Sequence, residues 1–157
     1  MFVLDANGIK IQLDIKGYKK SDKDNWDCQW CRCDFLFSSG EWLNYHKEND
    51  EILLSCEVEE LKDSLENLLD DSLVDVKEIN FIEPDFEFIL TPKQDLRNNP
   101  KYLYIKPGHE IADIFMEIRV YFWDGGLTDN YLSVTLYRDE ISKFKDYLSS
   151  IICNKGD

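Results

Sequence analysis

Three cysteines lie close together in the pattern Cys28-x-x-Cys31-x-Cys33. Thiolates at such spacing can bind zinc, which takes four ligands, and Cys56 or His46 could complete the set. On a β-strand, however, Cys31 and Cys33 face one side while Cys28 faces the other. The sequence has no second C-x-x-C motif. We therefore expect no bound metal, and we expect these cysteines to be buried or half-buried free thiols.

Other motifs for catalysis or cofactor binding are weak. The segment His109-Glu110-x-x-Asp113 lacks the second histidine of the zinc motif H-E-x-x-H and follows Pro107-Gly108, which favours a surface loop. The sequence contains no phosphate-binding loop, no G-x-S-x-G and no G-x-G-x-x-G. Carboxylates are too numerous for any pair to indicate glycosidase chemistry. These patterns predict a protein without a cofactor and without a recognisable active site.

The charge is strongly acidic, with 32 aspartates and glutamates against 18 lysines and arginines, a net charge of −14 on 157 residues. A field of this sign repels nucleic acid and anionic lipid and attracts basic proteins. No apolar stretch approaches the roughly 20 residues that cross a bilayer, and the chain begins without a basic and apolar leader. Five cysteines, an odd number, favour free thiols over a disulfide framework. We predict a cytoplasmic protein whose partner is a basic protein.

The hydrophobic pattern predicts a single α+β domain over residues 1–157, an antiparallel β-sheet system (sheet or sandwich) packed with two helices. The predicted strands cover residues 2–6, 9–15, 28–37, 41–46, 52–56, 77–83, 85–91, 111–123 and 131–136, and the predicted helices cover residues 57–71 and 138–152. Asn7-Gly8 suits the tight turn of the first hairpin. A turn is expected at 48–50, and a long loop over 92–108 with a short strand at 102–105.

The 57–71 helix carries an ordered row of carboxylates, which we name the acidic stripe: Glu59, Asp63, Glu66 and Asp70. At 100° per residue they fall within a sector about 60° wide, opposite the apolar stripe of the same helix. An ordinary solvated face is the alternative interpretation. In so acidic a chain, the acidic stripe is also a candidate binding surface for a basic partner, acting mainly on the rate of association.

The tryptophans are the second candidate for partner binding. Each has an acidic residue near it in the sequence, and aromatic anchors ringed by charge are typical of interface hot spots. Tryptophans on half-buried strands usually pack into the core, which is the alternative for all four: Trp26, Trp30, Trp42 and Trp123. Trp123 precedes the turn Asp124-Gly125-Gly126, and we predict that Trp123 and Asp124 contact a partner.

Three stretches together carry a family resemblance. They are Trp26-Asp27-x-x-Trp30 before a strand, Ile79-Asn80-Phe81-Ile82-Glu83-Pro84-Asp85-Phe86-Glu87-Phe88, and Leu136 leading into a terminal helix. This order resembles the WapI-like immunity proteins of bacteria, small cytosolic partners of contact-dependent polymorphic toxins. The chain departs from the family pattern at Cys31, where a leucine is common, and in the long segment 92–108.

The resemblance implies a non-enzymatic protein that binds a toxin domain, often a nuclease acting on RNA, and blocks its active site. A nuclease that grips RNA needs a basic cleft, which an acidic protein can occupy. Two alternatives stay open. One is an enzyme with an unrecognised site around Asp24, Asp27 and His46, and the other is an adaptor that self-associates through a strand edge. We favour a monomer.

Overall fold

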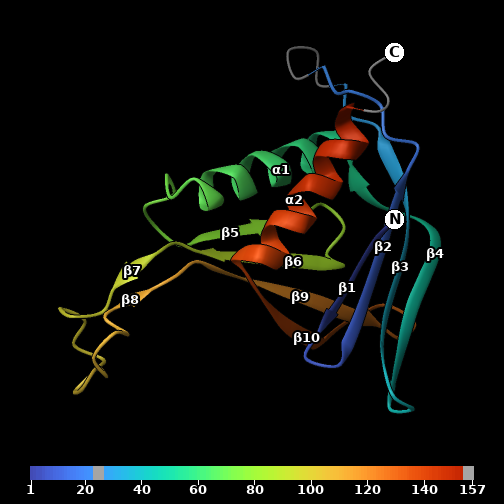
Figure 1. Ribbon diagram of the computed structural model, residues 1–157. Coiled ribbons are helices and arrows are strands. Elements are labelled where there is room, and N and C mark those ends of the chain that lie inside the picture. Colours follow the sequence, from blue (N-terminus) through green and yellow to red (C-terminus); the bar gives the residue numbers. More distant parts are fainter. Residues whose placement is uncertain (23–26, 154–157) are drawn as a thin grey trace.

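Two four-stranded antiparallel sheets and a pair of helices enclose one hydrophobic core in the computed structural model, which describes residues 1–22 and 27–153 (Figure 1). The first sheet has the strand order β1-β2-β3-β4. Its strands are β1 (Phe2–Ala6), β2 (Ile9–Lys16), β3 (Trp30–Ser39) and β4 (Leu43–Leu54). The predicted first hairpin is confirmed. Asn7 and Gly8 have φ values of 55° and 83°, as a two-residue turn of this kind requires.

β4 is one strand where the sequence predicted two separated by a turn. The expected turn at 48–50 is wrong, because Asn49 adopts a φ of 53° inside the strand instead of ending it. The register shifts here: Cys33 pairs with Asp50 but Phe35 pairs with Lys47, so β4 carries one extra residue. A β-bulge of this kind bends a strand without breaking the sheet.

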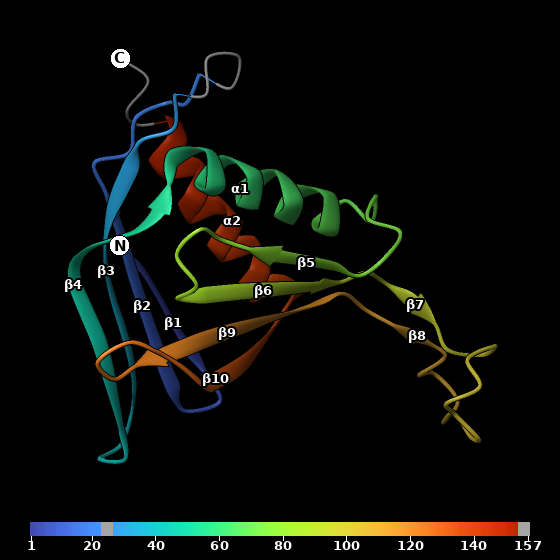
Figure 2. The same cartoon turned by 180° about the vertical axis from the view of Figure 1, so that it is seen from behind.

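The second sheet has the order β10-β9-β6-β5 and supplies the other half of the core. Its strands are β5 (Lys77–Asn80), β6 (Phe86–Thr91), β9 (Phe115–Trp123) and β10 (Leu127–Tyr137). Alternate residues of β6 and β9 are buried, as the period of two along a strand dictates. The opposite face of this sheet points away from the helices, and no described helix covers it (Figures 1 and 2).

Between β6 and β9 the chain leaves the core and forms a projecting segment, which we name the arm (residues 93–112). A two-stranded ribbon of β7 (Gln94–Asp95) and β8 (Ile111–Ala112) forms its base. The short strand predicted at 102–105 is wrong, because these residues are turn and coil. The single strand predicted over 111–123 is divided at positions 113 and 114, where the arm joins the sheet. Both views show the arm reaching beyond the sheet (Figures 1 and 2).

The two predicted helices are confirmed within two residues, as α1 (Ser55–Leu69) and α2 (Arg138–Cys153). Each has a carboxylate bonded to backbone at its N-terminus, where the helix dipole favours negative charge. Glu57 accepts a hydrogen bond from the Leu54 N–H at 2.8 Å, and Glu140 accepts one from the Tyr137 N–H at 2.8 Å. In the described part of the chain, neither helix is long and apolar enough to span a membrane.

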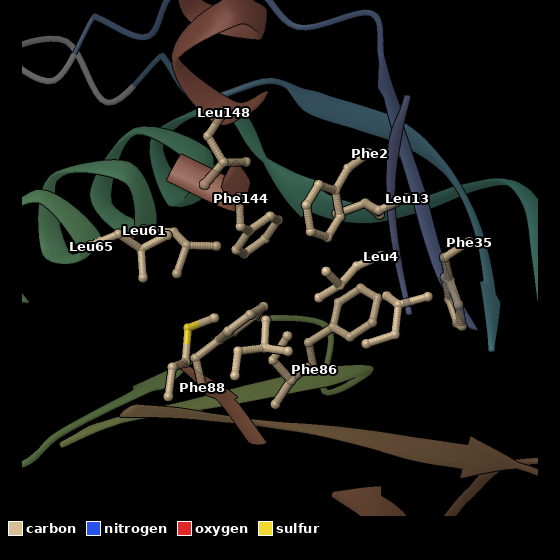
Figure 3. Packing of buried hydrophobic residues seen from close by; sticks show 14 of the residues in the cluster. Phe2, Leu4, Leu13, Phe35, Leu61, Leu65, Phe86, Phe88, Phe144 and Leu148 are labelled. Carbon is tan, nitrogen blue, oxygen red and sulfur yellow. The ribbon is translucent and has the colours of Figure 1, made fainter. Parts of the chain in front are cut away.

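The core lies where the two sheets and the helix pair meet (Figure 3). Phe35 of the first sheet contacts Phe86 of the second, with ring centroids 5.0 Å apart. Phe88 stacks on Phe144 of α2 at 5.9 Å, and Phe144 in turn lies 5.0 Å from Phe2. These rings connect all three layers, so the predicted α+β class is confirmed, and both four-stranded sheets contribute to the core.

Candidate functional site

The residues of the acidic stripe on α1 differ in their contacts and exposure. Glu59 is half-buried and accepts hydrogen bonds from the Tyr18 hydroxyl at 2.7 Å and from the Ser21 N–H at 2.9 Å. The Ser21 hydroxyl also donates to it, at 2.5 Å. Burial and the bond to Glu59 raise the pKa of Tyr18, so this phenol stays protonated. Glu59 therefore fastens the segment after β2 to α1.

The other stripe residues are more exposed. The Lys62 ammonium lies 2.7 Å from Glu66, one helical turn away, and 3.5 Å from Asp63. Its bond to Glu66 raises the pKa of Lys62. The Asp63 side chain is 59% exposed, and Asp70 is exposed at the C-terminal end of α1. Asp63, Glu66 and Asp70 thus form the solvent-facing part of the stripe.

Trp123 is half-buried where β9 approaches β4, rather than fully exposed. The Lys47 ammonium lies 4.6 Å from the centroid of its indole ring, a cation–π contact. The Trp123 backbone N–H donates to the Tyr45 hydroxyl at 3.2 Å. Asp124 is exposed in the following turn. Trp123 therefore contributes to the junction of the sheets, and Asp124 contributes charge at the surface.

The other tryptophans differ in exposure. Trp42 is the most exposed of the three described tryptophans, at 69%, and Trp30 is 36% exposed. Trp26 lies outside the described residues. The predicted partner-binding residues also form two separate groups. The acidic stripe lies in the helix layer, whereas the β9–β10 turn with Trp123 and Asp124 lies across the core from it (Figures 1 and 2).

The uncovered face of the second sheet holds a preorganised cluster that was not among the predicted site residues. Arg119 donates to Glu87 and to Glu117, each at 3.1 Å. The Tyr121 hydroxyl donates to Glu87 at 3.0 Å, and the Arg119 guanidinium lies 5.2 Å from the ring centroid of Tyr131. Although burial opposes it, bonding to both carboxylates raises the pKa of Arg119.

Tyrosine and arginine are enriched in the centres of protein interfaces, so this cluster is suited to binding. Its sequence signal is the outward set Phe115, Glu117, Arg119, Tyr121 and Trp123, which alternates with the buried positions of β9. Alternation alone places these residues on one face. It does not indicate whether a helix covers that face.

Cys28 and Cys56 form a disulfide, which corrects the expectation of free thiols at these positions. The cause lies in the register of the sheet. Trp30, the first residue of β3, pairs with Leu54, the last of β4, so Cys28 and Cys56 each lie two positions beyond that pair. Their Cα atoms are 5.6 Å apart. The pairing unites residues 28 positions apart, which spacing in the sequence does not reveal.

The remaining cysteines do not form a metal site. Cys31 and Cys33 are buried thiols outside the disulfide, as predicted, while Cys153 is exposed. Burial raises the pKa of the Cys33 thiol, which keeps it protonated and unreactive. Among residues 1–22 and 27–153, no group of three or more histidine, cysteine, aspartate or glutamate side chains could hold a metal ion.

The residues of the enzyme alternative are not gathered in one described site. Asp24 lies outside the described residues. His46 pairs with Leu36 in the middle of β3, about 20 Å along the strand from its start, whereas Asp27 precedes that start. His46 instead lines a hollow of about 400 Å³ with Asp14, Asp34 and Glu48, and Asp27 is not among the residues that line it.

On this α+β scaffold, an uncovered sheet face that presents Arg119 and Tyr121 is suited to binding another protein. The chain belongs to the Immunity protein WapI-like family, whose model matches residues 1–154. The resemblance found in the sequence is thereby confirmed over essentially the whole chain. A search of curated proteins finds no match. Family membership indicates toxin immunity, with a toxin protein as the partner, and immunity proteins are generally non-enzymatic.

Proposed function

We propose that this protein neutralises a basic bacterial toxin domain, a nuclease, by binding over its active site in the cytoplasm and without catalysing a reaction. Membership of the immunity family is the observation that carries the proposal. The net charge of −14 supports the sign of the partner. A nuclease that binds polyanionic RNA needs a basic cleft, and an acidic protein approaches such a cleft rapidly at low salt.

We place the toxin-binding surface on α1, at the acidic stripe. The support comes from Asp63, Glu66 and Asp70, which lie on the solvent-facing side of the helix. Glu59 contributes to the field, but its main contacts are to Tyr18 and Ser21. Trp123 and Asp124 form a second candidate contact on the other side of the core.

The test mixes the full chain with the toxin domain that we expect to be encoded immediately upstream, as the variable C-terminal domain of a large secreted protein. Binding should be tight and should weaken as salt rises, because the attraction between the opposite charges is screened. The triple variant Asp63→Asn, Glu66→Gln, Asp70→Asn should slow association by roughly tenfold at low salt. Failure of the parent protein to bind or protect would refute the proposed function.

A matched control separates local docking from the general field. The triple variant Glu41→Gln, Glu48→Gln, Glu51→Gln removes the same charge from exposed positions in β4 and in the turn that precedes it. We expect it to slow association less than the α1 variant does. Equal slowing by both triple variants would leave the charge argument in place but would show that α1 is not the binding surface.

A further inference from the structure

The arm exposes apolar surface that a monomer leaves in water. From residue 93 to residue 112, all of which the structure describes, no side chain is buried. Leu103 is fully exposed at the tip, and its neighbours Tyr102 and Tyr104 are 50% and 78% exposed. Adjacent large apolar side chains on a projecting segment are typical of a protein-interaction site. The ribbon of β7 and β8 holds this tip away from the rest of the molecule (Figure 1).

The charge of the arm is opposite to that of the rest of the chain. Its four cations outnumber its two carboxylates, giving +2, which leaves −16 on the remaining residues: Lys93, Arg97, Lys101 and Lys106 against Asp95 and Glu110. Asp95 is already paired with Arg97. Lys101 and Lys106 flank the apolar tip on either side. The arm therefore fits an apolar hollow with an acidic rim, and it is repelled by a basic toxin.

This chain itself carries such a hollow. A depression of about 200 Å³ lies beside β6 and the β9–β10 turn, with Phe81, Pro84 and Leu127 among its lining residues. Leu127 is 48% exposed, so part of this apolar lining faces water. Asp129 and Glu87, which is already paired with Arg119, also line the hollow, so Asp129 supplies most of its negative charge. None of the lining residues, which all belong to the described part, is a lysine or arginine.

The arm and the hollow lie at opposite ends of the same sheet. The arm begins before Phe115, the first residue of β9, whereas the hollow includes Tyr121 near the other end, and the whole strand is about 30 Å long. Both views show the arm bending away from the helices, toward the uncovered side of the second sheet (Figures 1 and 2). A two-fold axis through the middle of that side would bring each arm to the partner copy's hollow.

We propose that two copies of this chain form a closed dimer in which each arm tip occupies the hollow of the other copy. Each arm supplies local attraction to the other copy, although the remaining residues of both copies carry strong negative charge. At physiological salt, the repulsion between these acidic parts of the two copies is screened beyond about 8 Å, so contacts at the arm decide the association. The dimer leaves the helix layer, and with it the acidic stripe, accessible to a toxin.

Sedimentation velocity of the full chain, from low micromolar to submillimolar concentration, tests the dimer. We expect a concentration-dependent equilibrium between monomer and dimer. Leu103→Ser should weaken dimerisation on the order of thirtyfold, as expected for loss of an interface hot spot. Since Leu103 is fully exposed, this variant keeps its fold. Val74→Ser is the matched control, because Val74 is 85% exposed outside the arm, and it should leave the equilibrium unchanged.

Charge exchange tests the pairing of arm and hollow. Lys101→Glu together with Lys106→Glu should weaken the dimer, and adding Asp129→Lys in the same chain should restore much of the loss. A parent protein that stays monomeric throughout the concentration range would overturn the proposal. A series of species larger than the dimer would overturn the reciprocal arrangement. A monomeric parent whose Leu103→Ser variant binds the toxin domain less tightly would assign the arm to the toxin interface instead.

Discussion

The Lys47 ammonium lies 2.5 Å from the Asp85 carboxylate and joins the first sheet to the second. Lys47 pairs with Phe35 in the register of β4 and β3, so it is on the inward face of the first sheet. Asp85, just before β6, is only 2% exposed. Lys47 also lies 3.3 Å from Asp50 and stacks over Trp123. The charge of this inward lysine is thus balanced by groups from both sheets.

Lys47→Met should lower the free energy of unfolding by about 3 kcal/mol, because it leaves Asp85 buried without its partner. Burial already raises the pKa of Asp85 despite Lys47, so the loss should shrink at low pH, where this carboxyl group is protonated. Urea unfolding at neutral and acidic pH measures both effects. Lys16→Met, at an exposed pair with Asp34, is the control. An equal loss in the two variants would contradict a special role for the inter-sheet pair.

Local patterns in the sequence account for the elements but not for the contacts between them. The first hairpin follows from Asn7-Gly8, and both helices follow from the spacing of their apolar residues. In contrast, Lys47 and Asp85 are 38 positions apart, and the alternation that places Lys47 on the inward face with Leu43 and Tyr45 does not indicate its partner. The carboxylates of the α1 stripe were predictable as a row. The bond from Tyr18 to Glu59, 41 residues away, was not.

Arg138 offers a second test, because one side chain links three segments. Its guanidinium donates to the Leu69 carbonyl at 2.9 Å, to Asp113 at 2.6 and 2.9 Å, and to Asp71 at 3.0 Å. Arg138→Leu should therefore cost about 1 to 2 kcal/mol of stability and increase hydrogen exchange in the last turn of α1. Arg138→Lys keeps the positive charge but loses the planar guanidinium with its several donors. Its stability should therefore lie between that of the parent and that of Arg138→Leu. Unchanged exchange at the end of α1 would contradict this role.

Arg138 should also affect how the stability of the protein depends on acidic pH. Its bonds lower the pKa of Asp113 to about 2, below the ordinary value of 3.8. A carboxylate with a lowered pKa in the folded state stabilises the protein above the ordinary value, and this contribution is lost as the pH falls toward 2. Arg138→Leu should therefore show a smaller loss of stability between pH 4 and pH 2 than the parent. Parallel stability curves for the two proteins would contradict the coupling.

The disulfide between Cys28 and Cys56 predicts a difference between oxidised and reduced protein. Alkylation after denaturation should label three cysteines without reductant and all five with it, which intact mass measures directly. Reduction should lower stability by about 3 kcal/mol, since the bond closes a loop between residues 28 positions apart. Cys56→Ser should match the reduced parent and respond no further to reductant. Labelling of five cysteines without reductant would show that the bond is absent.

Tyr147 of α2 provides a prediction for alkaline pH. The oxygen of its partly buried hydroxyl accepts a hydrogen bond from the Ile15 N–H of β2 at 2.7 Å. Burial raises the pKa of Tyr147 from 10 to about 12, although the bond from Ile15 opposes the rise. A group whose pKa is higher in the folded state contributes stability that is complete below pH 10 and is lost as the pH rises through 12.

Tyr147→Phe should therefore cost about 1 to 2 kcal/mol at neutral pH, because the Ile15 N–H loses its acceptor. Between pH 10 and pH 12 the variant should lose less stability than the parent, since it no longer has this phenol to ionise. Urea unfolding across that range measures the difference in unfolding free energy between the variant and the parent. Lys47 and Tyr18 are present in both proteins, so their titration cancels in this difference. Tyr137→Phe, at a side chain that is 61% exposed, should leave the alkaline slope unchanged. If Tyr147→Phe and Tyr137→Phe both followed the parent in parallel, the contact between α2 and β2 would not be the source of the alkaline instability.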